Sequence, residues 1–278
     1  MKNIYFLIVF FIGFNLFAQD IKVITFNIRN NNPKNDDGEN AWPLRKDLVC
    51  QLLRFHEADI IGLQEAYSNQ VQDVASALEG FKWIGAGRDD GKEAGEFSPI
   101  FFNSKVFSLN EKGWFWLSET PEKPGKGWDA DYIRICTWGK FTQKTSGSII
   151  IVLNTHFDHR GKNTGSSSID LVLLKIKEIN TEKLPVIFMG DLNMTPDEEP
   201  IVTLKSQLHD SKEISIEAPY GSEGTTSDGF NFLSDLKKRI DYIFVNDQVT
   251  VLKYAVLSDS KNKHYFSDHL PVFVKVRL

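Results

Sequence analysis

The sequence contains little cysteine, because only Cys50 and Cys136 occur among its 278 residues. Small secreted proteins held together by disulfides carry several cysteines in a short chain, so this chain does not belong to that class. Both cysteines fall within segments that have the pattern of regular secondary structure, and we expect two buried thiols. A bridge between them stays open, because the export predicted below would place the chain in an oxidising compartment.

The sequence also lacks an excess of basic residues. Its 32 lysines and arginines are outnumbered by 37 aspartates and glutamates, which gives a formal net charge of −5. Tight binding of nucleic acid without regard to its sequence depends on positive surface charge. The composition therefore disfavours a nuclease, although a bound metal ion would reverse the sign of the charge locally and keeps that function open.

Internal repeats, low-complexity tracts and obvious linkers are absent. At 41% hydrophobic residues the chain can bury a large core. Length alone would allow one large or two small domains, and we expect a single domain over residues 20–278.

One apolar run, at the N-terminus, has the features of a targeting segment. It follows Lys2, extends from Ile4 to Leu16 and ends just before the small residue Ala18. This pattern predicts a signal peptide over residues 1–19 and an exported protein, periplasmic or secreted. A transmembrane anchor is the alternative, but the run is short for a span and a predicted strand follows at once. We therefore expect no stable membrane anchor.

Apolar periodicity predicts a mixed α/β fold. Helices are expected from Trp42 to about His56, from Ser68 to Gly80, from Ile169 to Ile179 and, briefly, from Pro196. In the first helix Leu44, Leu48, Leu52 and Phe55 have the spacing of a buried face, which would leave Arg45 toward solvent. Strands are expected at Ile21–Asn27, Ala58–Gln64, Phe81–Gly85, Tyr132–Phe141, Ser148–Thr155, Val186–Met189, Ile240–Val245, Thr250–Leu257 and Pro271–Val276, and as a hairpin at Phe97–Phe102 and Val106–Leu117.

Polar side chains stand at the ends of five strand-like segments. In layered α/β folds such ends converge on one rim, where ligands bind. Carboxylate and amide oxygens, with few histidines and no cysteine, suit Mg²⁺ or Mn²⁺ better than a closed Zn²⁺ site. A cation held in this way polarises a phosphoryl oxygen, so the set favours hydrolysis of phosphate esters. The residues are Asn27, Glu65, His156 with Asp158, Asp191 with Asn193, and Asp268 with His269.

Six short motifs, in order along the chain, resemble those of the endonuclease/exonuclease/phosphatase superfamily. That superfamily includes deoxyribonuclease I, apurinic endonucleases, bacterial sphingomyelinases, inositol polyphosphate 5-phosphatases and deadenylases. The resemblance implies a two-sheet α/β sandwich with the site at the rim between the sheets. The motifs are Thr25-Phe26-Asn27, Leu63-Gln64-Glu65, Asn154-Thr155-His156, Gly190-Asp191-Leu192-Asn193, Ile240-Asp241-Tyr242-Ile243-Phe244 and Ser267-Asp268-His269-Leu270-Pro271-Val272.

The resemblance also implies roles for individual residues. Glu65 would be the main metal ligand, with Asn27 and Asp268 beside it. The remaining residues would carry the catalysis: Asp241 would orient His269, Asp191 would act as general acid or base, and His156 and Asn193 would donate hydrogen bonds to the scissile phosphate. Because Arg29 stands where some apurinic endonucleases carry an acidic ligand, a second metal through that position is not expected.

Four further residues are candidates for substrate binding. Arg134 is either a phosphate clamp or a surface arginine on a strand. Trp128 lies in a glycine-rich loop and could line a pocket. Asp158 and His159 follow His156 closely, so they add polar groups near the site.

The sequence thus predicts an exported, Mg²⁺- or Mn²⁺-dependent phosphoester hydrolase, a phosphodiesterase or a phosphatase. Its substrate would be a phosphorylated small molecule, a lipid headgroup or a nucleic acid, and we expect a monomer. A secreted nuclease is the alternative. A non-catalytic binding module on the same fold would be expected to have lost some ligands, and a glycosidase would not need the histidines and asparagines.

Overall fold

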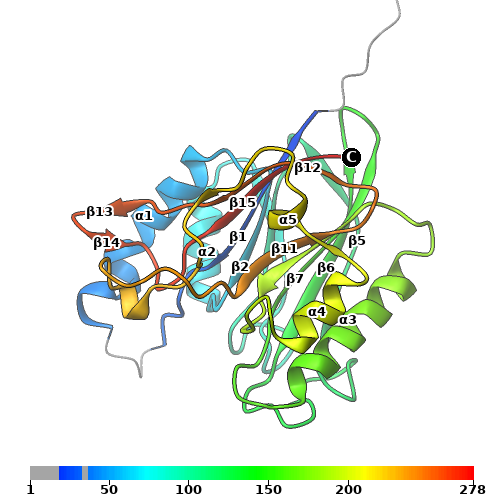
Figure 1. Cartoon of the computed structure of the whole chain (residues 1–278), viewed down its shortest axis with the longest axis horizontal. Coiled ribbons are helices and arrows are strands. Elements are labelled where there is room, and N and C mark those ends of the chain that lie inside the picture. Colours follow the sequence, from blue (N-terminus) through cyan, green and yellow to red (C-terminus); the bar gives the residue numbers. More distant parts are fainter. Residues whose placement is uncertain (1–18, 33–36) are drawn as a thin grey trace, which may run out of the picture.

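The computed structural model of the protein describes residues 19–32 and 37–278, so all but the last residue of the predicted signal peptide lies outside the described residues. The described chain forms two large sheets packed face to face, with helices on the outer faces (Figure 1). No helix in this part of the chain has both the length and the apolar character needed to span a lipid bilayer. The predicted two-sheet α/β sandwich is confirmed.

The first sheet has seven strands, in the order β10-β12-β15-β1-β2-β4-β3. These are β1 (Ile21–Asn27), β2 (Ile60–Gln64), β3 (Phe81–Ile84), β4 (Ile100–Asn103), β10 (Tyr220–Gly221), β12 (Thr250–Val256) and β15 (Val272–Arg277). The second sheet has six strands, in the order β5-β6-β7-β8-β11-β9. These are β5 (Phe107–Trp116), β6 (Ile135–Gln143), β7 (Ile149–His156), β8 (Val186–Asp191), β9 (His209–Asp210) and β11 (Asp241–Val245). The strands β13 (Ser260–Lys261) and β14 (His264–Tyr265) pair separately.

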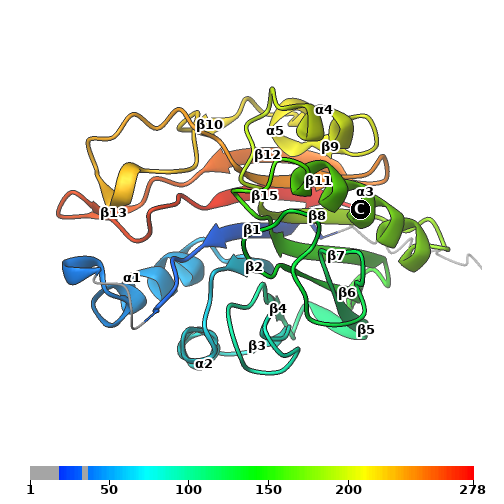
Figure 2. The same cartoon turned by 90° about the horizontal axis from the view of Figure 1, so that it is seen from below.

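Helices cover the two outer faces (Figure 2). Helices α1 (Trp42–Phe55) and α2 (Ser68–Ala77) pack on the seven-stranded sheet, where Val49 and Val74 join a core with Ile61. Helices α3 (Thr164–Ile179) and α4 (Glu199–Lys205) pack on the six-stranded sheet in the same way. A third apolar core lies between the sheets. The short helices are η1 (Gly38–Asn40), α5 (Ser211–Ile214) and η2 (Asp228–Phe230).

The alternation of side chains along each strand aims the site residues into the space between the sheets. In a strand, residues separated by an even number of positions point to the same face. Four strands carry a residue of the inter-sheet core two or four positions away from a predicted site residue. These core residues are Val23 for Asn27, Val152 for His156, Met189 for Asp191 and Ile243 for Asp241. The apolar core between the sheets is therefore replaced at one end by polar groups.

The predicted hairpin between the segments 97–102 and 106–117 is wrong. Strand β4 pairs with β2 and β3 in the first sheet, whereas β5 pairs with β6 in the second sheet. The turn at residues 104–106 carries the chain from one sheet to the other. Two adjacent strands with a short connection favour a hairpin on sequence alone, but here each strand finds its partner elsewhere.

The predicted buried face of α1 is only partly correct, because Leu52 is buried but two of its other members are exposed. Leu44 and Phe55 are 67% and 79% exposed, whereas Arg45 is only 4% exposed. The face that packs on the sheet runs instead through Trp42, Arg45, Val49 and Leu52. The charge of an arginine predicts a position in solvent. The Arg45 guanidinium is buried because backbone carbonyl groups inside the protein accept its hydrogen bonds.

Smaller differences concern helix ends and the cysteines. Helix α3 begins at Thr164, within a segment expected to be loop, and Tyr67 rather than Ser68 caps α2. Cys50 and Cys136 are both free and buried, as predicted, and they belong to the cores on opposite outer faces.

Candidate active site

Three side chains of the predicted site stand side by side on adjacent strands. His156 of β7 pairs in register with Asp191 of β8, and Asp191 lies opposite Asp241 of β11. All three are buried. From the other sheet, Nδ2 of Asn27 donates a hydrogen bond to Oδ2 of Asp191 at 3.0 Å. The two sheets are thus joined at the rim where the site was predicted.

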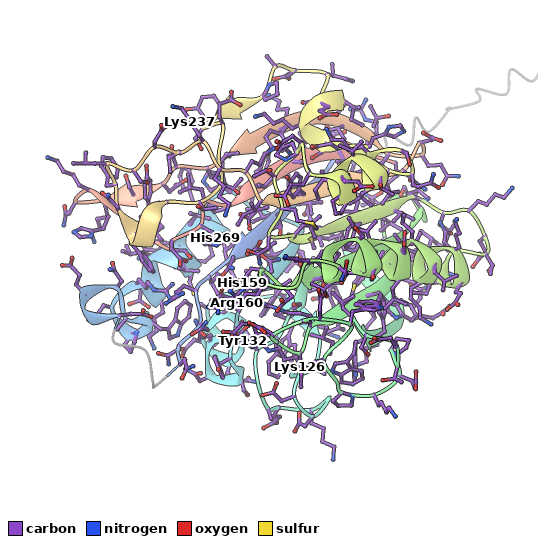
Figure 3. All side chains as sticks on the ribbon, turned by 60° about the horizontal axis from the view of Figure 1, so that its bottom comes forward. Lys126, Tyr132, His159, Arg160, Lys237 and His269 are labelled. Carbon is purple, nitrogen blue, oxygen red and sulfur yellow. The ribbon has the colours of Figure 1, made fainter. Side chains whose placement is uncertain are left out.

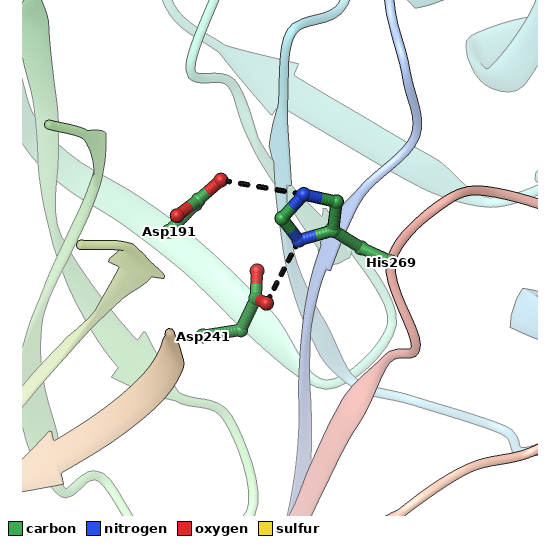
Figure 4. A group of neighbouring side chains, drawn as sticks. All are labelled: Asp191, Asp241 and His269. Atoms are coloured by element: carbon green, nitrogen blue, oxygen red, sulfur yellow. Dashed lines mark hydrogen bonds and ion pairs between the residues drawn. The ribbon is translucent and has the colours of Figure 1, made fainter. Parts of the chain in front are cut away.

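His269 lies between two carboxylates, as Figure 4 shows. Its Nδ1 is 2.8 Å from Oδ2 of Asp241, and its Nε2 is 3.7 Å from Oδ2 of Asp191. The hydroxyl of Thr225 also donates to Oδ2 of Asp241, at 2.6 Å. Burial acts to lower the pKa of His269, but the charges of Asp241 and Asp191 raise it well above its ordinary value. The two carboxylates therefore favour the charged form of the ring and fix its orientation.

Asp191 differs from an ordinary surface carboxylate. Burial raises its pKa to about 7, and the charge of Asp241 acts in the same direction. Besides the bond from Asn27, its Oδ1 accepts a hydrogen bond from the backbone N–H of Asn193 at 3.0 Å. A carboxyl group with a pKa near neutrality, fixed by hydrogen bonds, is suited to general acid–base catalysis.

Glu65 occupies a strained backbone position at the end of β2, with a φ of 62°. Side chains other than glycine seldom adopt this conformation, and they do so mostly where function requires it. Its carboxylate accepts hydrogen bonds from Nδ2 of Asn27 at 3.1 Å and from the backbone N–H and Nδ2 of Asn30. Although burial acts to raise the pKa of Glu65, the bond from Asn27 and the charge of His269 hold it below its ordinary value.

Asp268 supplies a second carboxyl group close enough to Glu65 for their charges to interact, and its side chain is 19% exposed. Burial raises the pKa of Asp268, and the positive charge of His269 only partly offsets this. The negative charge of Glu65 adds to the rise. Arg29 approaches Asp268 at 3.6 Å from Nη1 to Oδ2. Two acidic groups that disfavour each other's ionisation suit a hard divalent cation. Asn27 turns its Nδ2 toward Glu65, while its Oδ1 accepts a hydrogen bond from the backbone N–H of Arg29 at 3.0 Å.

A second candidate metal group consists of Asp191, Asp241 and His269, whose ligand atoms lie within 4.8 Å of one another. A cation there would have to displace the proton that the two carboxylates stabilise on His269. The acidic and histidine cluster between the sheets is thus a candidate metal centre.

His156 and Asn193 form a second pair of polar groups. Nδ2 of Asn193 lies 2.9 Å from Nε2 of His156 and donates to the carbonyl oxygen of Phe157 at 3.0 Å. Burial lowers the pKa of His156 well below its ordinary value, and the charges of Arg134 and Arg88 act in the same direction. His156 is therefore a neutral ring that can exchange hydrogen bonds with a substrate but carries no charge.

The site opens into a cavity of about 350 Å³. Figure 3 shows His269, His159 and Tyr132 on the face of the molecule where the cavity lies. The volume is sufficient for a small organic phosphate and is at the low end for ligand sites. The lining residues are Arg29, Asn30, Asn32, Glu65, Tyr67, Arg88, Glu96, Tyr132, Arg134, His156, His159, Asp191, Asn193 and His269.

Arg134 lines this cavity, although its side chain is only 5% exposed. Its Nε and Nη1 atoms are buried and have no hydrogen-bond partner. Glu96 and Asp158 are the nearest carboxylates, at 3.9 and 3.8 Å. Buried donors without hydrogen-bond partners are rare in folded proteins, so Arg134 is a candidate for binding an anionic group of a ligand.

Of the other substrate-binding candidates, only His159 lies in the cavity, where its ring stacks on Tyr132 with 5.5 Å between centroids. Asp158 is buried and accepts hydrogen bonds from the backbone N–H groups of residues 131, 132, 160 and 161. It holds two loops together and does not line the cavity. Trp128 lies outside the lining as well and packs against the core beneath α3.

Arg45 was not predicted to bear on the site. Its guanidinium donates to the backbone carbonyls of Ile28 and Arg29, which follow Asn27, and to that of Phe266, which precedes the Ser267-Asp268-His269 motif. It therefore ties together two loops that carry site residues. The tryptophan three positions earlier, whose ring lies 5.2 Å from the Arg45 guanidinium, is the one local signal in the sequence.

Three motif residues that are not candidate site residues form a buried hydrogen-bond network. Nε2 of Gln64 donates to Oγ1 of Thr25 at 2.9 Å and to Oδ1 of Asn154 at 2.6 Å. Nδ2 of Asn154 donates to the carbonyls of Leu63 and Pro99. This buried network crosses from one sheet to the other below the site, so it fixes their separation there.

Several lining residues come from segments treated as plain loop. Arg88 and Glu96 belong to the charged, glycine-rich segment 87–95 and its edge, while Asn30 and Asn32 follow the first strand. These residues cluster only in the folded chain. The one signal in the sequence for Arg88 and Glu96 is a run of charges between glycines, next to a buried strand.

Comparisons with known proteins agree with the fold and the motifs. A mannosyl-6-phosphatase of Bacteroides thetaiotaomicron is 38% identical, with a TM-score of 0.88 over 93% of this chain and all (100%) of that chain. An endonuclease/exonuclease/phosphatase of Bacteroides vulgatus is 36% identical, with a TM-score of 0.87 over 94% and 99% of the two chains. An uncharacterized mimivirus protein, L388, is 26% identical over 84% of this chain and 91% of its own length. The model of the Endonuclease/Exonuclease/phosphatase family matches residues 24–269, and the chain belongs to that family.

Proposed function

We propose that the protein is an exported, divalent-cation-dependent phosphomonoesterase that releases phosphate from a small phosphorylated sugar. The observation that carries this proposal is the buried Arg134 guanidinium, whose Nε and Nη1 lack hydrogen-bond partners in the wall of the cavity. A terminal phosphate has three oxygens free of ester links, whereas a diester has two, so a buried guanidinium beside the site favours a monoester.

The similarity to a mannosyl-6-phosphatase supports a hexose phosphate as the substrate. The cavity of about 350 Å³ would hold such a molecule, and the formal charge of −5 gives no electrostatic support for binding a long polyanion. The alternatives are less well supported: the negative formal charge disfavours a nuclease, and the sequence keeps the family's motif residues, which a non-catalytic module would be expected to have lost.

The resident cation would be held by Glu65 and Asp268, with the amide oxygen of Asn27 beside them. Bound there, it would polarise the phosphate and offset negative charge on the departing alcohol. Mg²⁺ and Mn²⁺ are the ions that this oxygen donor set would favour.

The chain's own residues would carry the proton transfers and orient the phosphate. Water attacks phosphorus while Asp191 accepts its proton, the ester P–O bond breaks on the opposite side, and the departing alkoxide takes a proton from solvent water; Asp191 then releases its own proton to solvent. His269, held as a cation by Asp241, donates a hydrogen bond to a phosphate oxygen as charge develops there. His156, Asn193 and Arg134 orient the other oxygens, so the phosphate stays in line with the attacking water.

The proposal is tested by an activity panel on the purified mature protein. After treatment with a chelator and addition of Mg²⁺ or Mn²⁺, we expect phosphate release from mannose 6-phosphate, and little or no cleavage of bis(p-nitrophenyl) phosphate, sphingomyelin or plasmid DNA. Asp191→Asn is the control for contaminating phosphatases. Faster turnover of either diester or of DNA than of the sugar phosphate would contradict the proposal.

Export is tested separately by mass spectrometry of the protein from its native host. A mature chain that begins near Gln19 or Asp20 is expected, because the apolar run ends in small Ala18 just before these residues. An intact Met1 terminus on the protein recovered from the cytoplasm would contradict this part of the proposal.

A further inference from the structure

The cavity wall includes a buried ion pair that the proposed chemistry does not use. Nη1 of Arg88 lies 2.5 Å from Oε2 of Glu96, and the two side chains are 13% and 12% exposed. Both residues line the cavity together with the catalytic groups. Structural ion pairs of this kind are usually packed on all sides, whereas this pair faces a space in which a ligand fits.

The loop between β3 and β4 fixes the pair in place. The backbone N–H of Arg88 donates to the carbonyl of Glu96 at 3.0 Å, so the two residues face each other across a narrow hairpin-like loop. Gly87 allows this close approach, because a Cβ there would lie 2.2 Å from the carbonyl oxygen of Ala94. The close approach of the two backbone segments therefore holds Arg88 and Glu96 opposite each other.

The pair retains capacity for further hydrogen bonds. Nε of Arg88 is buried and has no hydrogen-bond partner among the described residues, although Oδ1 of Asp89 lies 3.9 Å away. On the acceptor side, Oε1 of Glu96 receives only a long contact of 3.5 Å from Nδ2 of Asn30, the same amide that donates to Glu65 at 2.8 Å. One amide thus separates the ion pair from the candidate metal ligand, which places it within one small molecule's length of the reacting phosphate.

Burial also shifts the ionisation of Glu96. Burial raises its pKa to about 7, and the charge of Arg88 offsets this only in part. The ring of Tyr132 covers the guanidiniums of Arg88 and Arg134, at 5.7 and 5.5 Å from its centroid. The cavity therefore presents a carboxylate and a guanidinium side by side, screened from bulk water.

We propose that Glu96 and Arg88 bind two adjacent hydroxyl groups of the sugar whose phosphate is hydrolysed, and that this subsite selects the polyol part of the substrate. The inference rests on the proposed function and extends it from the phosphate to the alcohol. Each hydroxyl both donates and accepts, so one pair of hydroxyls donates to Glu96 and accepts from Arg88 at the same time. A phosphate ester whose alcohol part carries no further hydroxyl groups would bind more weakly. The buried Arg88–Glu96 pair would then lose contact with water without gaining hydrogen bonds from the substrate.

Glu96→Gln tests the subsite through a comparison of two phosphomonoesters. Mannose 6-phosphate offers adjacent hydroxyls, whereas p-nitrophenyl phosphate offers none. We expect kcat/KM to fall by about 10- to 100-fold for the sugar phosphate, the loss typical of one hydrogen bond to a charged group, and by less than about 3-fold for p-nitrophenyl phosphate. Glu93→Gln, at an exposed carboxylate of the same loop, should change neither value.

Deoxygenated substrates provide a second test that does not depend on how well the variant folds. Analogues of mannose 6-phosphate that lack the hydroxyl at carbon 2, 3 or 4 are compared with the parent compound. In the wild-type protein two neighbouring positions should account for most of the loss of kcat/KM, and in Glu96→Gln the same deletions should cost much less, because the partner is already impaired.

The outcomes separate this inference from the proposed function. An equal loss for both monoesters, or a shift in the Mg²⁺ concentration needed for half-maximal activity, would mean that Glu96 supports the fold or binds metal, and the subsite would be wrong. Equal losses at all three deoxy positions would contradict it too. Absence of turnover with every monoester would instead overturn the proposed function, and the subsite with it.

Discussion

Asp191 and Asp241 lie directly opposite each other on β8 and β11, two carboxyl groups on one rung of an antiparallel pair. Like charges in this relation repel, so a fold without a use for them would be destabilised. His269 relieves the repulsion by contacting both carboxyl groups. The arrangement ties the ionisation of a candidate base, Asp191, to that of a candidate electrostatic group, His269, so neither acts alone.

The first prediction concerns Asp241 and His269 as a unit. Asp241→Asn should lower kcat/KM by about 100-fold or more, because the imidazole loses the carboxylate that orients it and stabilises its charge. The same change in a His269→Ala background should cost little. A double-mutant cycle on phosphate release measures this coupling. Additive losses, or full activity in His269→Ala, would mean that the pair does not perform the proposed chemistry.

The second prediction concerns Glu65 as the principal metal ligand. Glu65→Gln keeps the volume of the side chain but removes the charge, so activity should fall by about 100-fold or more with little change in the melting temperature. Excess Mg²⁺ should restore part of the activity, which a titration of rate against metal concentration would reveal. Wild-type turnover of the variant at ordinary Mg²⁺ concentration would show that another group holds the ion.

The third prediction concerns Arg45, which holds together the loop that follows Asn27 and the loop that carries Asp268. Arg45→Met removes its hydrogen bonds to carbonyl groups of both loops, so kcat/KM should fall by about 100-fold, with a weaker apparent affinity for Mg²⁺. Val49→Ala, one turn further along the same buried face of α1, is the control for lost stability. If both variants lose activity in proportion to their loss of stability, Arg45 has no specific positioning role.

The sequence predicts a common site because polar side chains lie at or just after the ends of apolar, strand-like segments, and such ends converge on one rim. Once Val152 and Met189 are taken as core, alternation requires His156 and Asp191 to face the same space between the sheets. That inference needs only local pattern and the order of the motifs. The fold followed from the same strands and is confirmed by the similarity to solved structures of the family.

Features that depend on distant partners could not be read in this way. Arg45 is buried because carbonyl groups from other loops accept its hydrogen bonds, and no local pattern indicates those acceptors. Strands β4 and β5 join different sheets although only three residues separate them. Arg88 and Glu96 gain meaning only from the cavity that they line. In each case the deciding contact joins residues that are distant in the sequence, or residues that the geometry of a loop brings together.

The last prediction concerns stability away from the cavity. Arg239 and Asp210 form a buried, two-pronged ion pair with distances of 3.1 and 2.6 Å, and the two side chains are 6% and 0% exposed. Arg239→Met would leave the Asp210 carboxylate buried without its counter-charge, so the free energy of unfolding should fall by about 3–5 kcal/mol. Urea denaturation followed by tryptophan fluorescence measures the change.

Two further variants separate the ion pair from general effects of substitution. Arg239→Met combined with Asp210→Leu should recover much of the lost stability, because no uncompensated charge is then buried. Lys253→Met removes one partner of an exposed pair with Glu217, at 3.0 Å and with side chains 51% and 61% exposed, and it should change the free energy of unfolding by less than about 1 kcal/mol. If Arg239→Met is no more harmful than Lys253→Met, the buried pair contributes little to folding. If the double variant is as unstable as the single one, the loss comes from packing against Tyr242, whose ring lies 4.5 Å from the guanidinium, and not from the buried charge.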